Sequence, residues 1–600
     1  MIYLYDLTPT LSIDRADPAK AAAAWDEAHS VATLQGIVNR DAPVLYVRFV
    51  EMHGRNIDDW WLERLRAPGA WLADATIRRI GSLEELVATF HARIRGVVLY
   101  DPKVAATSNL ASTIAGVEDL IAVRYDPAPG SVYQRLVAGG PRLEVVRRLV
   151  RPDGTPMFTG SGTIPDTDLP SSGSAKCDAY MWAKVQYLDT RRCNPAYMGY
   201  YIDSFWIAHA AAGPPNHHTL TNHDFFVARR AFFCDLNCWG EETPVDDPRQ
   251  PIGADRRTLQ SILLTLYETG GKESMIHIGG FTPWAYKYTQ HGQAGGKHGG
   301  VDTEWEHVRL VSAYNGFIDA DALGLGAMAN ASFYAHFPLK DRYPQHRRLT
   351  GDDLKARGLV REDDRQFILF YVGDYDSAPW LYQRIPDLWD HPDRGKLPLA
   401  WAISPVLERR APMAMDWLRR TATPNDFFVA ADNGAGYLNP SMLAEPRPIS
   451  GLPSGLDAWR RFNRAFYDRW DLTISGFIID GHAPAMDRAC LDALASFSPG
   501  GVVPQKVPAP ALLHGNMPVL RSGPDINDND PVKAARAVLD TIAARKPMRF
   551  HWFRDILKPP SWHVAVMEEI TRQNPKVVLL DPHTFFELLR IDLQAKERDR

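Results

Sequence analysis

Apolar and amphipathic stretches alternate along the first 150 residues. Ile2 to Leu7 and Val44 to Val50 are short apolar runs typical of strands, and Ala19 to Val38 between them has the spacing of an amphipathic helix. Leu83 to Ile94 followed by Val97 to Asp101 repeats the step from helix to strand. Such alternation predicts a mostly parallel sheet with helices on its faces. We therefore expect an α/β accessory domain over residues 1–150.

A second and longer run of alternation begins at Met275. The strand candidates are Met275–Gly279, Ala327–Tyr334, Phe367–Gly373, Leu397–Ile403, Phe427–Ala431, Ile474–Ile479, Gly500–Pro504, Met548–Trp552 and Val577–Leu580. Helical patterns separate most of them. Seven or eight such units in about 325 residues are typical of a β/α barrel, so we expect a catalytic barrel over residues 273–600. An open doubly wound sheet is the alternative, because the pattern alone does not close a barrel.

Between these two regions the pattern changes twice. Residues 151–174 are dense in turn residues, which is typical of a linker at a domain boundary. Residues 175–272 have mainly helical spacing and several large aromatic side chains. The predicted fold class is therefore α/β: a small N-terminal α/β domain and a helical segment, followed by a C-terminal TIM-like barrel of seven or eight strands.

Composition limits the possible partners. The 600 residues carry 67 Lys and Arg against 72 Asp and Glu, a formal net charge of −5, which argues against a dedicated nucleic-acid binder. No apolar run reaches the roughly 18 residues of a membrane span. The segment from Met1 to Leu7 has neither the basic leader nor the long apolar stretch of an export signal. We expect no nucleic-acid or membrane partner, and a cytoplasmic protein unless a leader was removed; the oligomeric state stays open.

The strongest chemical pattern is an Asp directly after several apolar strands. Asp374 and Asp376 follow one strand candidate, Asp432 follows the next but one, and Asp480 follows the one after that. Because barrel active sites are built where strands end on the carboxyl side, these carboxylates are expected to converge. Glycoside hydrolysis needs two of them, one protonated as acid and one ionised as base or nucleophile. The structural alternative is that each Asp caps the following helix or turn.

A glycine-rich segment follows Asp432. Gly434 and Gly436 let a ligand approach the main chain closely, and Tyr437 then offers a ring face and a hydroxyl. Asn433 and Asn439 flank this segment and could bond sugar hydroxyls, although a plain tight loop would look the same. Further candidates for substrate contacts at the barrel mouth are Trp380, His482, Trp552 and Arg554. Arg554 would either clamp a substrate carboxylate or balance the Asp residues of the barrel itself.

The segment after the first predicted barrel strand holds a second cluster of polar and aromatic residues. Its candidates for substrate contacts are Trp284, Lys287, Tyr288, His298 and Trp305, with Glu304 as an alternative general acid. The glycines nearby lack Walker spacing, so a loop that closes on a sugar is favoured over a phosphate loop. The structural alternative for Glu304 is an exposed position at a helix start, where a negative charge suits the helix dipole.

Metal-binding patterns are weak. Cys234 and Cys238 have a suitable spacing for zinc, but Cys177 and Cys193 are too widely separated to form the second pair, so buried thiols are favoured. Asp530 and the proline after it are more typical of a helix N-cap than of a calcium loop. We therefore expect no metal ion and no cofactor.

Several motifs together resemble a known family. Its name motif is present as Gly434, Gly436, Tyr437 and Pro440, with Asn439 where the pattern has a second Tyr. The likeness extends to residues 33–40, 280–284, 287–288, 296–300, 303–306, 374–380 and 581–586. The chain thus resembles the GxGYxYP putative glycoside hydrolases along nearly its whole length. The resemblance implies sugar processing and assigns no catalytic residue; Asn439 removes one aromatic platform.

The resulting hypothesis is a glycoside hydrolase that acts on an oligo- or polysaccharide. Its acid and its base or nucleophile are expected among Asp374, Asp376, Asp432 and Asp480. Two alternatives from other classes stay open, a metal-dependent carbohydrate deacetylase and a glycan-binding protein without catalysis. Loss of activity in a chelator would favour the deacetylase.

Overall fold

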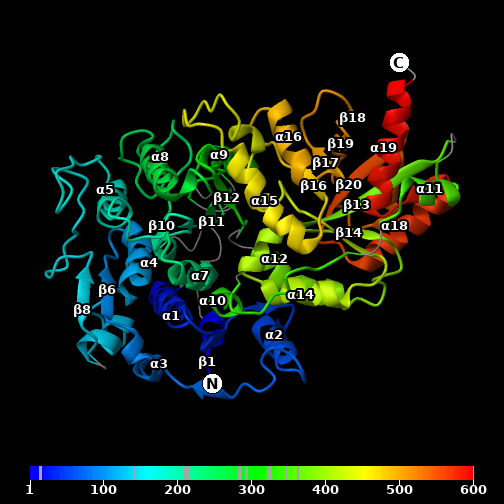
Figure 1. Ribbon diagram of the computed structural model, residues 1–600. Helices are drawn as coiled ribbons and strands as arrows, with labels where there is room; N and C mark the ends of the chain where they lie inside the picture. Colours follow the sequence, from blue (N-terminus) through cyan, green and yellow to red (C-terminus); the bar gives the residue numbers. More distant parts are fainter. Residues whose placement is uncertain are drawn as a thin grey trace. The chain divides into compact units, whose positions relative to one another are not determined.

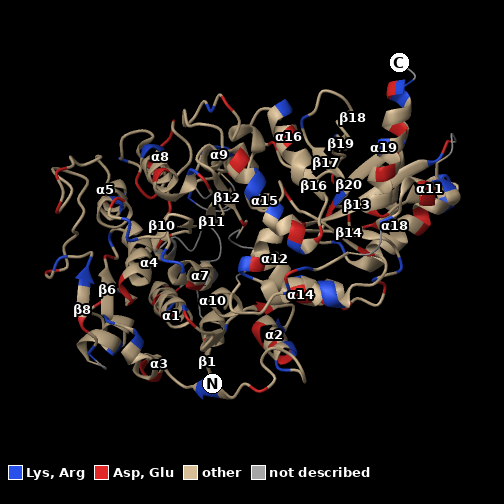
Figure 2. Ribbon diagram, in the orientation of Figure 1, with Lys and Arg blue, Asp and Glu red and all other residues tan. Residues whose placement is uncertain are grey.

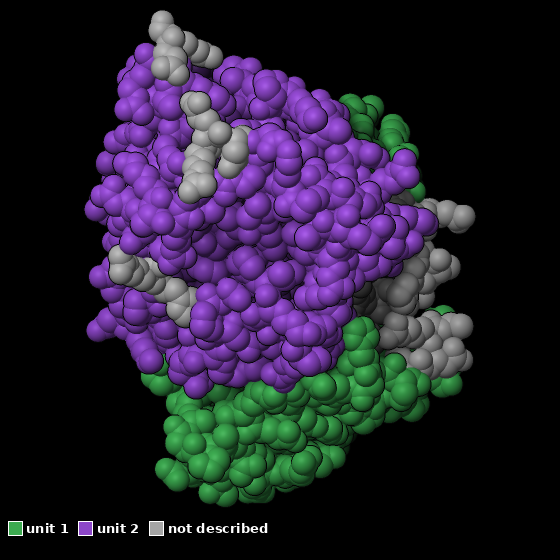
Figure 3. Space-filling model, turned by 90° about the vertical axis from the view of Figure 1, so that its right-hand side faces the viewer, with its two compact units in different colours: residues 1–338 green, residues 339–600 purple. Residues whose placement is uncertain are grey.

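The computed structural model describes residues 1–12, 17–139, 142–208, 217–281, 287–290, 295–320, 328–345, 348–360 and 364–598. The chain divides into two compact units, Met1–Pro338 and Leu339–Arg600, which are coloured separately in Figure 3. Both units combine parallel sheets with helices (Figure 1), so the predicted α/β class is confirmed.

Unit 1 begins with two small parallel sheets. In the first, β1 (Ile2–Asp6) lies between β2 (Leu45–Arg48) and β5 (Ile77–Ile80). The second has the order β7-β6-β8, with β6 (Gly96–Tyr100), β7 (Leu120–Arg124) and β8 (Val145–Arg148). The short hairpin β3 (Glu51–Met52) with β4 (Arg55–Asn56) precedes helix α2 (Ile57–Leu65). Helices α3 (Leu83–Thr89) and α4 (Ala106–Glu118) follow β5 and β6.

The first long helix, α1 (Pro18–Val38), differs from the expected amphipathic helix. Its N-cap Asp17 accepts hydrogen bonds from the backbone N–H groups of Ala19 and Lys20, which fixes its start. Beyond the first turn nearly every side chain is buried, including polar ones such as His29 and Gln35. Because α1 packs against α7 and β7, it is covered on almost all sides rather than along one stripe.

A third sheet of unit 1 holds strands that the sequence pattern assigned elsewhere. It has the all-parallel order β10-β9-β11-β12, from β9 (Tyr197–Tyr200), β10 (Phe232–Cys234), β11 (Ile276–Gly280) and β12 (Gly316–Ile318). The segment expected to be mainly helical therefore supplies two strands. Strand β11, expected to open the barrel, instead pairs with β9 and β12 in unit 1.

Along the sequence, the helices of unit 1 after residue 174 lie before, between and after the strands of this third sheet. They are α5 (Ala175–Ala183), α6 (Phe205–Ala208), α7 (His223–Ala228), α8 (Ala254–Leu266), α9 (Gly300–Ser312) and α10 (Ala331–Tyr334). Helix α10 lies where a strand over 327–334 was expected, and residue 327 itself is outside the described residues. A short, fully buried segment gives the same sequence pattern whether it forms a strand or a helix. Here Asp224 Oδ2 accepts hydrogen bonds from the backbone N–H and the hydroxyl of Ser332, which hold the start of the helix.

Unit 2 is built around the long strand β13 (Gln366–Tyr375). On one side β13 pairs with β20 (Phe550–Ile556), and on the other with β21 (Val577–Leu579) at its start and β14 (Leu399–Ile403) at its end. Strand β15 (Asp426–Val429) continues the sheet beyond β14, and every pairing is parallel. These strands lie within a few residues of the runs that the sequence predicted.

A second sheet of unit 2 has the order β16-β17-β19-β18. Strands β16 (Ile474–Ile478), β17 (Gly501–Pro504) and β19 (Met517–Leu520) are parallel, and β18 (Ala511–His514) forms an antiparallel hairpin with β19 that the pattern did not predict. Two single parallel bridges lie outside the regular ladders: Ala430, just after β15, pairs with Ser475 of β16, and Asp525, in the loop after β19, pairs with Arg554 of β20. The closed TIM-like barrel stays a prediction.

Helices follow most strands of unit 2. They are α11 (Gly351–Ala356), α12 (Ala378–Gln383), α13 (Ile385–Trp389), α14 (Pro412–Thr421), α15 (Leu456–Trp470), α16 (Arg488–Phe497), α17 (Pro531–Ala544), α18 (Pro560–Gln573) and α19 (Pro582–Arg598). Helix α17 confirms the predicted start, because Asp530 accepts a bond from Val532 N–H and Pro531 occupies its first position.

The two faces of β13 and β20 carry different side chains. Ile368, Phe370 and Phe553 point to one face, where they pack with α17 and α18 in a buried apolar cluster. On the other face the Tyr371 ring lies 5.2 Å from the Trp552 ring, and both rings contact Phe477 of β16. Alternation along the strands thus aims a second, aromatic set of side chains away from the covering helices.

Candidate active site

The carboxyl ends of β13 and β15 bring acidic side chains together in unit 2. Asp432 is 4% exposed, and its Oδ1 accepts a hydrogen bond of 2.8 Å from the Tyr371 hydroxyl. Asp376, which is 8% exposed, lies close enough to lower the pKa of Asp432. Burial has the larger effect and raises the pKa of Asp432.

Arg554 supplies the positive charge of this cluster. It extends from β20, lies over the Phe477 ring at 5.2 Å and pairs with Asp525 at 3.1 Å. Its charge lowers the pKa values of Asp374 and Asp432, although burial outweighs it in both. The guanidinium pKa is in turn raised by these carboxylates. Of the two interpretations of Arg554 from sequence, balancing the protein's own carboxylates has direct support in these contacts.

Asp374 combines an unusual backbone with an unusual acidity. Its φ of +74° lies in the left-handed region, beside a register shift between β13 and β14. Burial raises its pKa to about 6, with further increases from the charges of Asp432 and Asp525. A carboxyl group of this kind is partly protonated near neutral pH, as a general acid requires.

Asp480 lies at the end of β16 with a different set of contacts. Its Oδ2 accepts a bond of 2.8 Å from the Lys506 backbone N–H, while its buried Oδ1 has no hydrogen-bond partner. Burial raises its pKa to about 6. Asn433 and Ile479 bond to each other in both directions, at 3.1 and 3.2 Å, so the loops that carry Asp432 and Asp480 are neighbours. No described contact joins Asp480 directly to the Asp376–Asp432 pair.

The glycine-rich loop after Asp432 is held by a network of buried bonds. Gly434 has φ +101°, and a Cβ added there would lie 2.5 Å from Asn463 Oδ1, which accepts from Ala435 N–H. Asn439 donates to the Ile479 carbonyl at 2.8 Å, and Tyr437 is 2% exposed. Glycine is therefore required at residue 434 for close packing of the loop against α15.

The remaining candidates at these strand ends differ in exposure. His482 is exposed and Trp380 is half-buried on α12, so both can reach solvent. Trp552 is 1% exposed and its Nε1 has no hydrogen-bond partner. Trp552 is thus a buried residue that packs against Tyr371, and its ring is not accessible for stacking on a sugar.

Lys287 lies in unit 1 and is buried among carboxylates. Its Nζ is 3.1 Å from Asp203, 2.8 Å from Asp235 and 2.9 Å from Asp246. Asp203 follows β9 and Asp235 follows β10, and both loops lie at the carboxyl edge of the third sheet. Lys287 is 1% exposed, and the three carboxylates raise the pKa of its ammonium. The three N–H groups of the Lys287 ammonium are thus directed at carboxylates of the protein itself.

Other residues of the second predicted cluster also lie in unit 1. Tyr288 is fully buried and donates to the Asp235 carbonyl at 2.9 Å. His298 stacks on Trp239, with ring centroids 3.6 Å apart. Glu304 and Trp305 are half-buried on α9, and Trp284 lies outside the described residues. These residues belong to a different unit from the Asp residues that they were expected to join.

Sequence reasoning missed several polar groups next to the carboxylates. Tyr371 lies in an apolar run, and only the alternation against Ile368 and Phe370 separates it from the core face. Asp525 follows the hairpin that the pattern did not detect. On the helix-facing side, Asp555 Oδ2 is 3.0 Å from His563 Nε2, and both side chains are fully buried.

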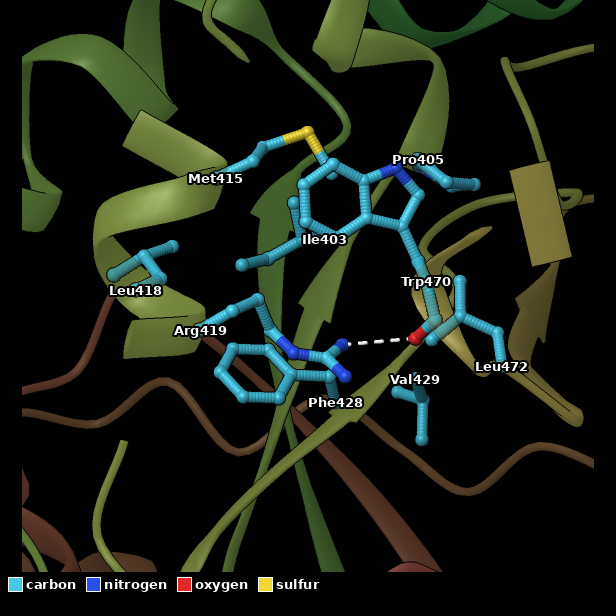
Figure 4. A pocket seen from close by; sticks show the side chains of 9 residues that line it. All are labelled: Ile403, Pro405, Met415, Leu418, Arg419, Phe428, Val429, Trp470 and Leu472. Carbon is cyan, nitrogen blue, oxygen red and sulfur yellow. Dashed lines mark hydrogen bonds between the residues drawn. The ribbon is translucent and has the colours of Figure 1, made fainter. Parts of the chain in front are cut away.

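One small cavity of unit 2 lies beside β14 and β15, apart from the carboxylates. Figure 4 shows Met415, Leu418 and Trp470 around it, with Arg419 donating to the Trp470 carbonyl at 2.9 Å. Its volume of about 20 Å³ holds roughly one water molecule and no sugar ring. This cavity is therefore a packing gap in the core.

Charge and metal-ligand geometry complete the description of the site. Lys, Arg, Asp and Glu are interspersed over the elements of both units (Figure 2). Within the described ranges, no His, Cys, Asp or Glu side chains form a group of three or more that could hold a metal ion. All five cysteines are buried and unbridged. Over the same ranges, no helix has the length and apolar character needed to cross a membrane.

Comparisons with known proteins find a family match within unit 2 and a similar fold for the whole chain. Residues 364–590 match the model of the GxGYxYP putative glycoside hydrolase C-terminal domain, which confirms the family resemblance over this part. A putative hydrolase from Bacteroides thetaiotaomicron VPI-5482 has a similar structure, with a TM-score of 0.65 and 15% identity over 99% of this chain and 95% of that chain. At this identity the likeness shows the fold alone. No curated protein matches the sequence.

Proposed function

Since unit 2 contains the GxGYxYP putative glycoside hydrolase C-terminal domain, we propose that this protein hydrolyses a glycosidic bond of an oligo- or polysaccharide. The observation that carries the proposal is the set of buried carboxyl groups at the ends of parallel strands, where Asp432 accepts a hydrogen bond from Tyr371 and burial raises the pKa of Asp374 to about 6. Glycoside hydrolysis uses one protonated and one ionised carboxyl group.

The roles of the carboxylates follow from their surroundings. Asp432 is oriented by Tyr371 and attracted by Arg554, so it is the proposed base or nucleophile. Asp374 and Asp480 have pKa values of about 6 and are the proposed proton donors. Asp376 is the proposed positioning residue for Asp432, whose pKa it lowers. Glu304 on α9 is the remaining candidate for the acid.

Substrate contacts are proposed at the rim of the same strand ends. Trp380 and His482 are the candidates with solvent access, and Asn433, Tyr437 and Asn439 shape the loop between them. Lys287, Tyr288, His298 and Trp305 of unit 1 were candidates from sequence and stay proposals, together with Trp284.

We also propose that the strands of unit 2 form a barrel-like ring in the order β13-β14-β15-β16-β17-β19-β20. The bridges from Ala430 to Ser475 and from Asp525 to Arg554 supply the two links that regular ladders lack. The ring contacts of Phe477 with Tyr371 and Trp552 support the proposed ring of strands, because β16 is paired with neither β13 nor β20 and yet its side chain meets theirs. A ring of this kind directs catalytic residues to its carboxyl end.

The test is the release of reducing ends from a broad glycan panel, with acetate release measured in parallel and with EDTA present or absent. The proposal expects reducing ends that EDTA does not diminish. Acetate release that EDTA abolishes would instead favour the metal-dependent carbohydrate deacetylase. Glycan binding without either product would favour a binding protein.

A further inference from the structure

Unit 2 has a large groove at the amino end of β20 and the carboxyl end of β19. The groove has a volume of about 710 Å³, within the range of small-molecule sites. It lies between the β18–β19 hairpin, residues 544–548 before β20, and the end of α19. Because β20 rises about 3.3 Å per residue and Arg554 is its fifth residue, the backbone of Arg554 lies roughly 13 Å from the amino end of the strand.

Basic side chains dominate the charges that line this groove. Arg521, Arg545, Lys546 and Lys596 face one acidic residue, Glu597. Lys596 pairs with Asp592 at 2.7 Å, which balances its charge. In the described part of the chain, no carboxylate lies within ion-pair distance of the other three. Among the lining residues, these three cations and the anion of Glu597 leave a surplus of two positive charges.

The two arginines are fixed by the backbone rather than by acids. Arg521 donates to the Val507 carbonyl at 2.6 Å, and Arg545 donates to the Ser522 carbonyl at 3.3 Å. Partial burial and the neighbouring charge of Arg521 together lower the pKa of Arg545. Two guanidinium groups held near each other without a carboxylate cost free energy, and a bound anion would offset that cost.

The rest of the lining is aliphatic. Leu512 and Leu513 come from the hairpin, Met548 from the loop before β20, and Leu593 from α19. None of the lining residues is aromatic, so the groove lacks the flat faces on which sugar rings stack. Its chemistry suits a ligand with a compact anionic group and a small aliphatic or polar body.

We propose that this groove is a second ligand site, which binds a phosphate dianion, either free or as a small organic phosphomonoester. Arg521 and Arg545 bind the phosphate oxygens through their forked N–H donors, and Lys546 adds a third charge at the exposed edge. The dianion matches the surplus of two positive charges. This inference is independent of glycosidase activity, because the groove shares no residue with the carboxylate site.

The test is calorimetric titration of the full-length protein with inorganic phosphate, glucose 6-phosphate, glucuronate and glucose. We expect one equivalent of phosphate or glucose 6-phosphate to bind, with at least tenfold weaker binding in both Arg521→Gln and Arg545→Gln. Arg536→Gln, which removes an exposed charge of α17 outside the groove, should leave the affinity unchanged. Tighter binding of glucose 6-phosphate than of phosphate identifies an organic phosphomonoester, and equal binding identifies free phosphate.

A second readout separates ligand binding from a structural role. Each substitution removes the repulsion between the two guanidiniums and also the hydrogen bond of that arginine to a backbone carbonyl, so the readout is the change in melting temperature when phosphate is added to each protein. Phosphate should raise the melting temperature of the wild type and Arg536→Gln only. The proposal is overturned if no anion binds at millimolar concentration, if glucuronate binds as tightly as the phosphates, or if both groove variants retain wild-type affinity.

Discussion

Replacing Asp480 by Asn should stabilise unit 2 at neutral pH. Asp480 is fully buried, one of its oxygens has no partner, and its pKa rises from 3.8 to about 6. Because the folded protein solvates the ionised carboxylate of Asp480 less well than water does, ionisation of Asp480 lowers the free energy of unfolding. This loss of stability is absent below pH 3.8, grows as the pH rises, and is complete above about pH 6.

The structure sets the size of this effect. A pKa difference of about 2.2, at about 1.4 kcal/mol per unit, gives an upper limit of about 3 kcal/mol at pH 7. The Asn oxygen can still accept a hydrogen bond from the Lys506 N–H. The new amide N–H groups lack a partner, however, and this lowers the stability by about 1–2 kcal/mol. The net gain of about 1–2 kcal/mol corresponds to a rise of roughly 2–8 °C in the melting temperature of unit 2.

The assay is thermal and urea unfolding of Asp480→Asn and wild type at pH 7 and pH 4.5. At pH 4.5 the ionisation cost that Asn removes should fall to about one third of its value at pH 7. Asp487→Asn is the matched control, because Asp487 caps α16 through Cys490 N–H and Asn caps a helix equally well. A lower melting temperature for Asp480→Asn at pH 7, or a gain that does not depend on pH, would refute the reasoning.

Three further substitutions test other parts of the structure. Tyr371→Phe removes the hydroxyl bound to Asp432, so kcat should fall by about tenfold or more with KM little changed, measured by steady-state kinetics; an unchanged kcat would exclude this role. Gly434→Ala forces a Cβ to 2.5 Å from an amide oxygen at φ +101° and should cost about 2–3 kcal/mol in urea unfolding, while Gly451→Ala, at positive φ in open space, should cost about 1 kcal/mol. Equal losses would contradict the packing argument. Lys287→Met leaves three buried carboxylates without their shared cation and should cost about 3–5 kcal/mol, detected by limited proteolysis and calorimetry; a wild-type transition would contradict it.

The sequence predicted the strands of unit 2 well because hydrophobic periodicity is strong there. Strands β13, β14, β16 and β17 begin and end within a few residues of their apolar runs, and helices follow them. Periodicity failed where buried elements are short. Helix α10 is short and fully buried, so its residue spacing does not distinguish a helix from a strand.

The assignment of β11 to the barrel failed for a different reason. Strand and helix continue to alternate on both sides of it, so nothing local marks where one sheet ends and the next begins. Pairing with β9, about eighty residues earlier, decides its sheet, and such long-range pairing leaves no trace in local spacing. The residues after β11, from Lys287 to Trp305, were therefore expected at the wrong sheet.

The candidate site was partly predictable. Asp374, Asp376 and Asp432 were expected to meet because they follow parallel strands, and they do lie within electrostatic or hydrogen-bond reach. Tyr371 was not expected, since a tyrosine within an apolar strand gives no local indication that its hydroxyl meets a carboxylate on a strand two places along the sheet. Convergence follows from topology, whereas individual hydrogen bonds depend on side-chain packing.

The most direct test of the central claim compares reducing-end release by wild type, Asp376→Asn and Asp432→Asn on the most active glycan of the panel. Asp471→Asn, a substitution at the end of α15 outside the carboxylate pair, is the control. The account predicts that either substitution in the pair lowers kcat by at least about a hundredfold while the protein stays folded, with EDTA and the control having no effect. Undiminished release by both pair variants would contradict the assignment of this site.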